Sequence, residues 1–363
     1  MDARDTKHRL VAIGTSAEGV VELRRLVKTL PATLGAAIAV VVHGDADESP
    51  LPNGIGPDTP LPIDYAQHTE HIVPGRIYVA PPDRHMLIKG DQVCLVHGPK
   101  ENDTRPAIDP LFRSAAFAYG ARAIGIVLSG SLDDGTAGLL AIKDRGGIAV
   151  VQDPTDAMAP SMPGSAAAHV AVDHCRALRD IGPLIAALVA NTGIAPAEIA
   201  PVGRRELSTR VIELEHYISD AGVALTDRDW WNELVTPCGL TCPECQGVLG
   251  EVRDRRVLRF RCQTGHAYSA MTLLRVLAAT SEAAVGASLR ALAQEAELAR
   301  RLAIQPAHAT DAAALAKLAS SITSGALELR TMLRSQLQQT PFTSATLPRT
   351  HMVPASDRSC PER

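Results

Sequence analysis

The chain has 363 residues, of which 46% are hydrophobic and 3% aromatic, and its formal net charge is −4 at pH 7. This length fits two domains, or one domain with appendages, and the apolar share is large enough for a sizeable core. The charge excludes a global basic field for nucleic acid or an anionic membrane surface, so proteins or small molecules are the expected partners. The charged N-terminus and the lack of an apolar run near the roughly 18 residues that span a bilayer predict a cytoplasmic protein without membrane insertion.

Short β-branched runs alternate with helical stretches from residue 9 to about residue 190. This alternation predicts an α/β fold, with a doubly wound and mostly parallel sheet covered by helices. Strands are expected at Leu10–Ile13, Ala37–Val42, Ile77–Val79, Ala123–Leu128, Ile148–Val151 and His169–Val172. Covering helices are expected between Val20 and Leu30, between Leu111 and Tyr119, and from Gly138 to Asp144, where Gly146-Gly147 ends the last one. Asp45–Pro62 lacks periodicity and is expected to be a loop near the mouth of a site.

The rest of the chain divides by composition. A predicted domain covers residues 1–190, followed by a linker at 191–236 with an amphipathic helix around Leu207–Ile218. A compact Cys/His segment occupies 237–270, with a strand at Val257–Phe260. Residues 271–340 are rich in Ala, Leu, Glu and Arg and predict two antiparallel helices with a break at Gln305-Pro306. The polar tail at 341–363 is expected to be disordered.

Three polar residues follow three of the predicted strands. Ser16 comes after the first strand, His43 after the second, and Asp134 after Leu128-Ser129-Gly130. Because the carboxyl ends of parallel strands lie at one edge of a sheet, residues far apart in sequence can converge there. A histidine can take the proton of a serine hydroxyl, and a carboxylate can hold the imidazole in the useful tautomer. Ser16 is therefore a candidate nucleophile, with His43 and Asp134 as its partners.

The residues alone leave other interpretations open. A Ser-x-x-Gly turn is often a helix cap or a phosphate-binding turn, and Asp133-Asp134-Gly135-Thr136 is most simply a turn with a helix cap. A nucleotide site at the Gly14–Gly19 turn is disfavoured, because Glu18 would repel a phosphate and no acidic ribose partner stands at the expected distance. The order Ser, His, Asp also differs from the triad orders of α/β-hydrolases, chymotrypsin and subtilisin.

Several motifs follow one another in the first half of the chain. They are Ile13-Gly14-Thr15-Ser16, Val42-His43, Tyr78 to Met86, Arg105 to Ser114, and Leu128 to Gly138, extended by Gln152-Asp153-Pro154 and Ser161-Met162-Pro163. Together they resemble the catalytic domain of the CheB-type chemotaxis receptor methylesterases, over roughly residues 8 to 190. Separated motifs in the right succession are more specific than any one of them.

The resemblance implies an activity and a set of site residues. The family hydrolyses methyl esters of receptor glutamate side chains, releasing methanol, and can deamidate receptor glutamines. Carried over to this chain, the resemblance implies Ser16 as nucleophile, His43 as general base and acid, and Asp134 as the carboxylate that orients it. The backbone amides of Ala17 and Ser131 would form the oxyanion hole. Catalysis would need no cofactor, and methyl-accepting chemotaxis receptors or related signalling proteins would be the partners.

The chain departs from the family pattern near the site. The family usually has Gly-x-Ser-Thr-Gly-Gly, whereas Ala17 and Glu18 follow Ser16 here. Ser131-Leu132 replaces Met-Gly, and Gly44-Asp45-Ala46 replaces Met-Pro-Pro. A Glu18 carboxylate about 6 Å from the oxyanion would cost roughly 3 kcal/mol at an effective dielectric of 20, whereas a solvent-facing one would complement the helix dipole. These departures favour a second hypothesis, a non-catalytic CheB-like adaptor that binds partners through its C-terminal region.

A cluster of cysteines indicates a metal. Cys242 and Cys245 are followed, after sixteen residues, by Cys262 and His266. Three thiolates and one imidazole close a tetrahedral shell around a structural zinc ion and leave no open position for catalysis. Metal binding would then supply the folding free energy of a segment too small to fold on apolar burial. The alternative is a metal-free remnant with inert thiols, and Cys238 is either a substitute ligand or a bystander.

The C-terminal half resembles an extension found on some stand-alone CheB-like proteins. The arginines at 253, 255, 256, 259 and 261 alternate along a predicted strand and are expected to form a solvated face rather than a nucleic-acid site. Arg84, His85 and Arg105 could meet an acidic receptor segment or form structural ion pairs. A conventional family member carries an N-terminal receiver domain, whereas the predicted catalytic sheet begins here within ten residues of Met1. Control by aspartyl phosphorylation is therefore not expected. The zinc module and the helices could dock a partner or mediate self-association.

Overall fold

The computed structural model describes residues 8–44, 59–190, 202–219, 229–254, 256–308 and 310–339. The chain forms two compact units, of which the first ends at Leu273 and the second begins at Leu274. Most of the predicted loop at Asp45–Pro62 lies outside the described residues. The same holds for residues 191–201 of the predicted linker and for the predicted tail at 341–363.

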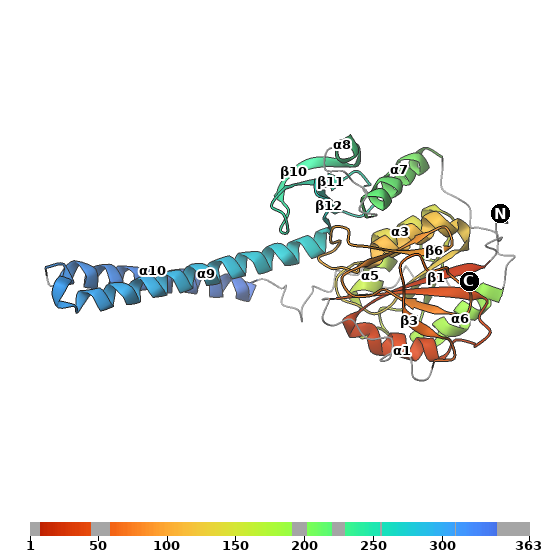
Figure 1. Cartoon of the computed structure of the whole chain (residues 1–363), viewed down its shortest axis with the longest axis horizontal. Helices are drawn as coiled ribbons and strands as arrows, with labels where there is room; N and C mark the ends of the chain where they lie inside the picture. Colours follow the sequence, from red (N-terminus) through yellow and green to blue (C-terminus); the bar gives the residue numbers. More distant parts are fainter. Residues whose placement is uncertain are drawn as a thin grey trace, which may run out of the picture. The chain divides into compact units, whose positions relative to one another are not determined.

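A seven-stranded parallel sheet is the centre of the first unit (Figure 1). Its strand order is β3-β4-β2-β1-β7-β8-β9, and all six neighbouring pairs are parallel. The strands are β1 (Arg9–Ser16), β2 (Ala36–His43), β3 (Ile63–Tyr65), β4 (Ile77–Val79), β7 (Ala123–Val127), β8 (Ile148–Gln152) and β9 (His174–Arg176). The predicted α/β fold with a parallel sheet is therefore confirmed.

Helices cover both faces of this sheet. One face packs against α1 (Val20–Lys28) and α6 (Leu178–Ala190), and the other against α3 (Ile108–Tyr119), α4 (Thr136–Asp144) and α5 (Ser161–His169). Successive residues of β1 point to opposite faces and all of them are buried. A strand buried on both sides reads as a continuous apolar run, which is why the sequence pattern revealed these strands. Gly146, at φ 80°, ends α4 as expected.

One predicted strand is wrong. Residues His169–Val172 do not form a strand, because α5 runs to His169 and the edge strand is β9, which begins at His174. The small residues of α5 form a helix in which Pro163 lies in the first turn, where a missing N–H costs nothing. Several short elements were not predicted. They are the hairpin of β5 (His85–Lys89) and β6 (Gln92–Val96), the edge strand β3, and the 3-10 turns η1 (Ala17–Gly19) and η3 (Gly120–Arg122).

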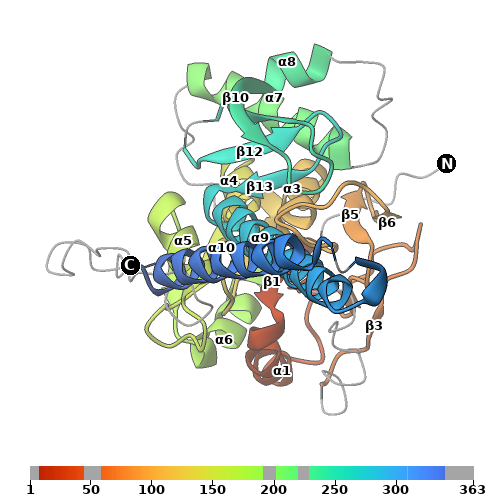
Figure 2. The same cartoon turned by 90° about the vertical axis from the view of Figure 1, so that its left-hand side faces the viewer.

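A smaller antiparallel sheet completes the first unit (Figure 2). It contains β10 (Val235–Thr241), β11 (Val248–Val252), β12 (Arg259–Cys262) and β13 (Ala267–Ser269), in that order. Two helices accompany it, α7 (Val202–Ser219) and α8 (Asp229–Leu234). Trp230 and Trp231 lie in a small apolar cluster with residues of α7, β10 and β11. The predicted helix at Leu207–Ile218 lies within α7, and the strand predicted from Val257 begins two residues later.

The second unit contains two long helices. These are α9 (Ala270–Ala303), which starts four residues before the boundary, and α10 (Ala312–Gln339), separated by the 3-10 turn η4 (Pro306–His308) at the predicted break. Arg300 donates a hydrogen bond of 2.8 Å to Thr323 across the pair. Among the described residues, α9 alone passes a test for a membrane span by length and composition, with a mean hydropathy of 1.2 over 18 residues. Helices of proteins outside membranes also pass this test.

Candidate active site and metal centre

Ser16 and His43 end two neighbouring strands of the large sheet. They are partners in the β1–β2 register, so their Cα atoms lie about 4.8 Å apart. Gly130, in the loop after β7, approaches Ser16 closely, because a Cβ on it would lie 2.1 Å from the sulfur of Met162 and 3.1 Å from Cβ of Ser16. A larger residue here would have to displace the buried Met162 side chain and would crowd Ser16. The approach of the β7–α4 loop to the serine therefore depends on this residue.

The structure brings His43 and Asp134 into direct contact. His43 Nδ1 lies 2.8 Å from Asp134 Oδ2, and both side chains are buried. The hydroxyl of Thr104 lies 3.0 Å from the same nitrogen. Because the carboxylate holds the proton on Nδ1, Nε2 is the nitrogen left to accept a proton from a neighbouring hydroxyl. The buried Oγ of Ser16 has no hydrogen-bond partner among the described residues.

The carboxylate of Asp134 is held by five donors. Its Oδ2 accepts from His43 and from the backbone N–H of Ile108 at 2.7 Å. Its Oδ1 accepts from Asn102 Nδ2 at 2.8 Å and from the N–H groups of Gly135 and Asp109 at 2.9 and 3.2 Å. Burial alone would raise the pKa of Asp134, but the His43 contact and the other donors outweigh it and lower the pKa below the usual value. The group is thus ionised at neutral pH.

A second buried carboxyl group lies beside the first. Asp109 accepts a hydrogen bond of 2.6 Å from the N–H of Gly138 and one of 3.2 Å from Asn102 Nδ2. Burial, together with the negative charge of Asp134, raises the pKa of Asp109 to about 7. Asn102 and Thr104 lie between β6 and α3 outside every motif, so no sequence pattern identified them as site residues. Asp109 lies in a matched motif but was not identified as part of the site.

Two of the departures from the family pattern contact each other. The hydroxyl of Ser131 donates a hydrogen bond of 2.7 Å to Glu18 Oε2, and the Glu18 side chain is exposed. Leu132 has a φ of 63°, in the left-handed region that favours glycine, which is the residue the family has there. Ala17 is the first residue of η1, where a backbone N–H has no acceptor within the helix. The oxyanion-hole roles of Ala17 and Ser131 stay predictions.

The three basic residues near the site mainly make structural contacts. His85 is fully buried, where its Nε2 bonds the carbonyl of Pro99 at 2.9 Å and burial lowers its pKa. Arg105 donates to Asp83 at 2.7 and 2.9 Å and to the carbonyl of Gly98 at 2.6 Å. Arg84 is exposed and contacts the Asp83 carbonyl at 3.5 Å. The structural interpretation is favoured for His85 and Arg105.

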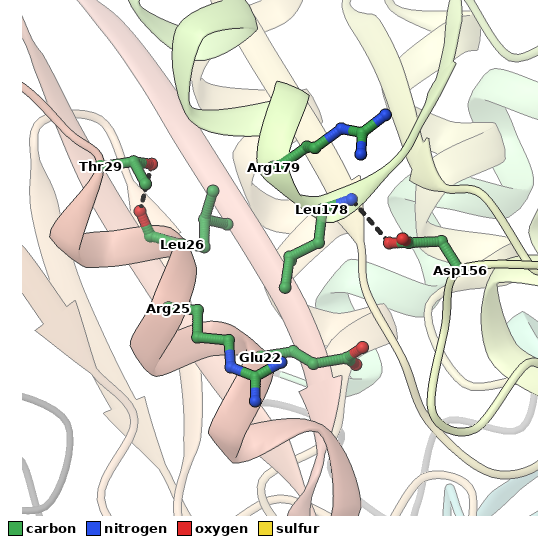
Figure 3. Close-up of a pocket in the computed structure, with 7 residues that line it drawn as sticks. All are labelled: Glu22, Arg25, Leu26, Thr29, Asp156, Leu178 and Arg179. Atoms are coloured by element: carbon green, nitrogen blue, oxygen red, sulfur yellow. Dashed lines mark hydrogen bonds between the residues drawn. The ribbon is translucent and has the colours of Figure 1, made fainter.

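A pocket of about 310 Å³ lies between α1 and the start of α6 (Figure 3). It is lined by Glu22, Arg25, Leu26, Thr29, Asp156, Leu178 and Arg179. None of these is a predicted site residue. Glu22 is buried and accepts a hydrogen bond of 3.0 Å from Gln152. The pocket is therefore distinct from the group formed by His43 and Asp134.

The four predicted metal ligands come together on two turns of the smaller sheet. Cys242 and Cys245 lie in the β10–β11 turn, and Cys262 and His266 flank the β12–β13 turn, with all four ligand atoms within 4.8 Å of one another. The Cys245–Cys262 sulfur distance is 3.6 Å, and His266 Nδ1 lies 3.5 and 3.7 Å from the sulfurs of Cys262 and Cys242. Tetrahedral zinc with bonds of about 2.0 to 2.3 Å requires ligand separations of roughly 3.5 to 3.8 Å. The donors therefore fit zinc, whereas Cys238 bonds the carbonyl of Leu249 instead.

Two of the arginines expected on a solvated face are buried. Arg259 donates to Glu215 at 2.6 and 2.8 Å, and Arg261 donates to Glu101 at 3.1 Å and to Glu215 at 3.2 Å. Arg113 of α3 completes this buried ion cluster with bonds of 2.6 and 2.7 Å to Glu101. Residues 259 and 261 share one face of β12 because strand side chains alternate. The prediction was wrong for these two because α7 and the segment before α3 cover that face.

Comparisons with known proteins match the first half of the chain. A family model described as CheB methylesterase matches residues 11–185. A Leptospira interrogans protein, provisionally named as a protein-glutamate methylesterase/protein-glutamine glutaminase, is 36% identical over 51% of this chain and 96% of its own length. The Moorella thermoacetica protein-glutamate methylesterase/protein-glutamine glutaminase is 35% identical over 51% of this chain, which spans only 45% of that protein. The Thermotoga maritima CheB methylesterase catalytic domain is 27% identical, with a TM-score of 0.47, over 50% of this chain and 99% of that domain.

Proposed function

The chain belongs to the CheB methylesterase family, and on that premise we propose that it is a serine hydrolase that removes methyl esters from glutamyl side chains of chemoreceptors and deamidates receptor glutamines. Its relatives are named for both activities. The observation that carries the proposal is the 2.8 Å bond between His43 and Asp134, placed beside Ser16 by the strand register. This arrangement orients a general base on the strand next to Ser16, whose buried hydroxyl has no hydrogen-bond partner among the described residues.

The proposed reaction has two halves. Ser16 Oγ attacks the ester carbonyl while His43 Nε2 takes its proton, and Asp134 stabilises the imidazolium. The oxyanion of the tetrahedral intermediate accepts from the N–H groups of Ala17 and Ser131. Collapse of the intermediate releases methanol, which takes the proton from His43. A water molecule then attacks the acyl-enzyme while His43 takes its proton and passes it to the departing Ser16 oxygen, which restores the serine and leaves a glutamate carboxylate on the receptor. A glutamine substrate releases ammonia in place of methanol in the first half.

The test is methanol release from a methylated receptor signalling fragment by the full chain and by Ser16→Ala under identical conditions. The proposal predicts release by the wild type and background release by the variant. No release by a folded wild-type chain, while a known methylesterase acts on the same fragment, contradicts it. Ammonium release from an unmodified fragment tests the deamidase activity in the same way.

The second candidate is a non-catalytic adaptor of chemosensory signalling that binds partners through its C-terminal half. The observations that favour it are the left-handed Leu132 and the negative charge of Glu18 bound to Ser131, both on the loops beside the serine. Both features would weaken stabilisation of the oxyanion, and neither would disturb the His43–Asp134 pair. If the chain is an adaptor, the wild type should bind the receptor fragment as tightly as Ser16→Ala does. Neither protein should then release methanol.

We also propose that Cys242, Cys245, Cys262 and His266 hold a structural zinc ion, because the donor set and spacing fit tetrahedral coordination. With four protein ligands the ion has no open position, so its role would be to fix the two turns of the smaller sheet. We further propose chemoreceptors or related signalling proteins as partners, a cytoplasmic location, and self-association through α9 and α10. The division into domains at residues 190, 236, 270 and 340 stays a prediction.

A further inference from the structure

The smaller sheet contacts the segment that carries the donors to Asp134. The N–H of Ala267 donates to the carbonyl of Lys100 at 3.2 Å, and the N–H of Asn102 donates to the carbonyl of Ala267 at 2.8 Å. Glu101 and Ala267 thus form a parallel bridge. Residues 100–102 extend the edge of this sheet next to β13, although they belong to the connection that leads into α3.

Asn102 joins this edge to the candidate active site. Its Oδ1 accepts a hydrogen bond of 2.8 Å from the N–H of Ser269, while its Nδ2 donates to Asp134 at 2.8 Å and to Asp109 at 3.2 Å. An amide has distinct donor and acceptor ends, so the Ser269 N–H fixes which end faces the carboxylates. Asn102 is 3% exposed, so loss of either partner would leave a buried polar group unsatisfied.

Two further contacts hold β13 in this position. Asp133, the neighbour of Asp134, accepts hydrogen bonds from the hydroxyls of Ser269 and, at 3.4 Å, Thr272. Glu101 lies in the buried ion cluster, bonded to Arg113 of α3 and to Arg261 of β12. Burial would raise the pKa of Glu101, but the two arginines lower it well below the usual value, so the group is charged. Hydrogen bonds and buried charges therefore both fix the position of β13 against the segment before α3.

The metal-ligand turn lies directly before β13. The N–H of Gly265 donates to the carbonyl of Cys262 at 3.0 Å, and Arg261 donates to the carbonyl of Gly265 at 2.7 Å. His266 precedes Ala267, the residue whose carbonyl accepts a hydrogen bond from the N–H of Asn102. The ligand His266 therefore lies three residues before Ser269, whose N–H donates to Asn102.

We propose that Asn102 is a positioning residue through which the metal-bearing sheet holds Asp134 in the orientation that His43 needs, so that metal occupancy sets the activity of the site. This inference rests on the esterase function proposed above and on the zinc site. It assigns the C-terminal extension a role in the first half of the chain: the extension completes the support of the orienting carboxylate.

Removal of the Asn102 amide is the first test. Asn102→Gly is the suitable variant because the residue has a φ of 52°, which glycine adopts without strain. We expect a 10- to 100-fold loss in kcat with little change in KM, as for other supports of a catalytic group. The acid limb of the pH–rate profile should move to higher pH, because a carboxylate with one donor fewer stabilises the imidazolium more. Thr69→Gly, at φ 63° on an exposed residue, makes the same kind of backbone change away from the site and should leave kcat and the acid limb unchanged.

Coupling to the metal is tested by a double-mutant cycle with Cys245→Ser, with the zinc content measured in each protein. Loss of the ligand should lower kcat in the wild type and add no further loss to Asn102→Gly, because both changes remove the same support. Hydrogen exchange of residues 98–112 should be faster in Cys245→Ser and unchanged in Cys238→Ser. If the losses in kcat from the two substitutions multiply in the double variant, the proposal is wrong. It is also wrong if the zinc-free chain keeps the wild-type rate of hydrogen exchange in residues 98–112. The exchange readout does not require esterase activity, so it separates failure of this inference from failure of the proposed function.

Discussion

At the residue scale, Ser16 and His43 lie at the ends of neighbouring strands, whereas Asn102 and Thr104 reach the site from an irregular connection. Ser16 and His43 could be assigned to one edge because the apolar runs before them are continuous and both end in polar residues. Asn102 and Thr104 could not, because they lie in an irregular connection and their partners come from the distant residues Ser269 and His43. A single sequence has no periodic signal for such long-range side-chain contacts.

The charge of Glu18 is predicted to slow the reaction. Its carboxylate is bound to the side chain of Ser131, whose N–H would stabilise the oxyanion, so a negative charge lies near the place where charge develops. Solvent screens an exposed group, so we expect Glu18→Gln to raise kcat on the order of 3- to 10-fold. Steady-state methanol release measures this effect, with Glu282→Gln on α9 as the control. An unchanged or lower kcat would show that Glu18 supports the loop rather than opposes the oxyanion.

Asp109 is predicted to make stability depend on pH. Its folded-state pKa is raised from 3.8 to about 7, so the stability it contributes is full below its unfolded pKa and is lost as the pH rises through 7. At about 1.4 kcal/mol per pKa unit the loss is on the order of a few kcal/mol. Urea unfolding at pH 5 and pH 8 should show a smaller decrease for Asp109→Asn than for the wild type. An equal decrease in both proteins would assign the pH dependence to other groups.

At the scale of elements, burial on both faces made β1, β2, β4, β7 and β8 readable. The edge strands β3 and β9 are as short as β4 but only partly buried, so they lack its continuous apolar run. Helix α5 consists mostly of small residues without a clear apolar face. The charged face of β12 was misassigned because alternation shows which residues share a face but not what covers that face. Its partners lie on α7 and before α3, which only the tertiary structure brings near.

The buried ion cluster is predicted to stabilise the contact between α7 and β12. Glu215→Gln leaves Arg259 and Arg261 buried with a neutral partner, so we expect a loss of about 3 to 5 kcal/mol in the free energy of unfolding. Urea titration measures it. The control is Glu213→Gln on the same helix, whose partly exposed pairs with Arg145 and Arg210 at 3.7 and 3.8 Å should cost only about 0 to 1 kcal/mol. Equal losses would mean that the cluster contributes no more than a surface pair.

At the scale of the molecule, the two sheets of the first unit belong together. The sequence separated them by composition, whereas the structure places both in one compact unit that ends at Leu273. The contacts between them are made by side chains scattered over α3, α7, β12 and β13, which no boundary in composition reveals. The two helices of the second unit and the break between them lie where the sequence predicts them. Long amphipathic helices with a proline break depend mostly on local signals.

Metal removal is predicted to destabilise the first unit. The smaller sheet packs against only a small apolar cluster around Trp230 and Trp231, so zinc bound at its two turns would supply part of its folding free energy. We expect one zinc ion per chain by elemental analysis, and a lower unfolding temperature after chelation or in Cys262→Ser. Cys238→Ser should keep both the metal and the unfolding temperature. A wild-type chain that binds no zinc, yet unfolds at the same temperature with and without chelator, would contradict the metal site.

The most direct test of the account is kcat/KM for methyl-ester hydrolysis by Ser16→Ala, by His43→Ala and by the double variant. Residues that act as one unit lose nearly everything with the first substitution. We predict that each single variant loses about 10⁴-fold or more and that the double variant loses no more than either one. Substantial activity in Ser16→Ala, or losses that multiply in the double variant, would contradict the assignment of Ser16 and His43 to one nucleophilic unit.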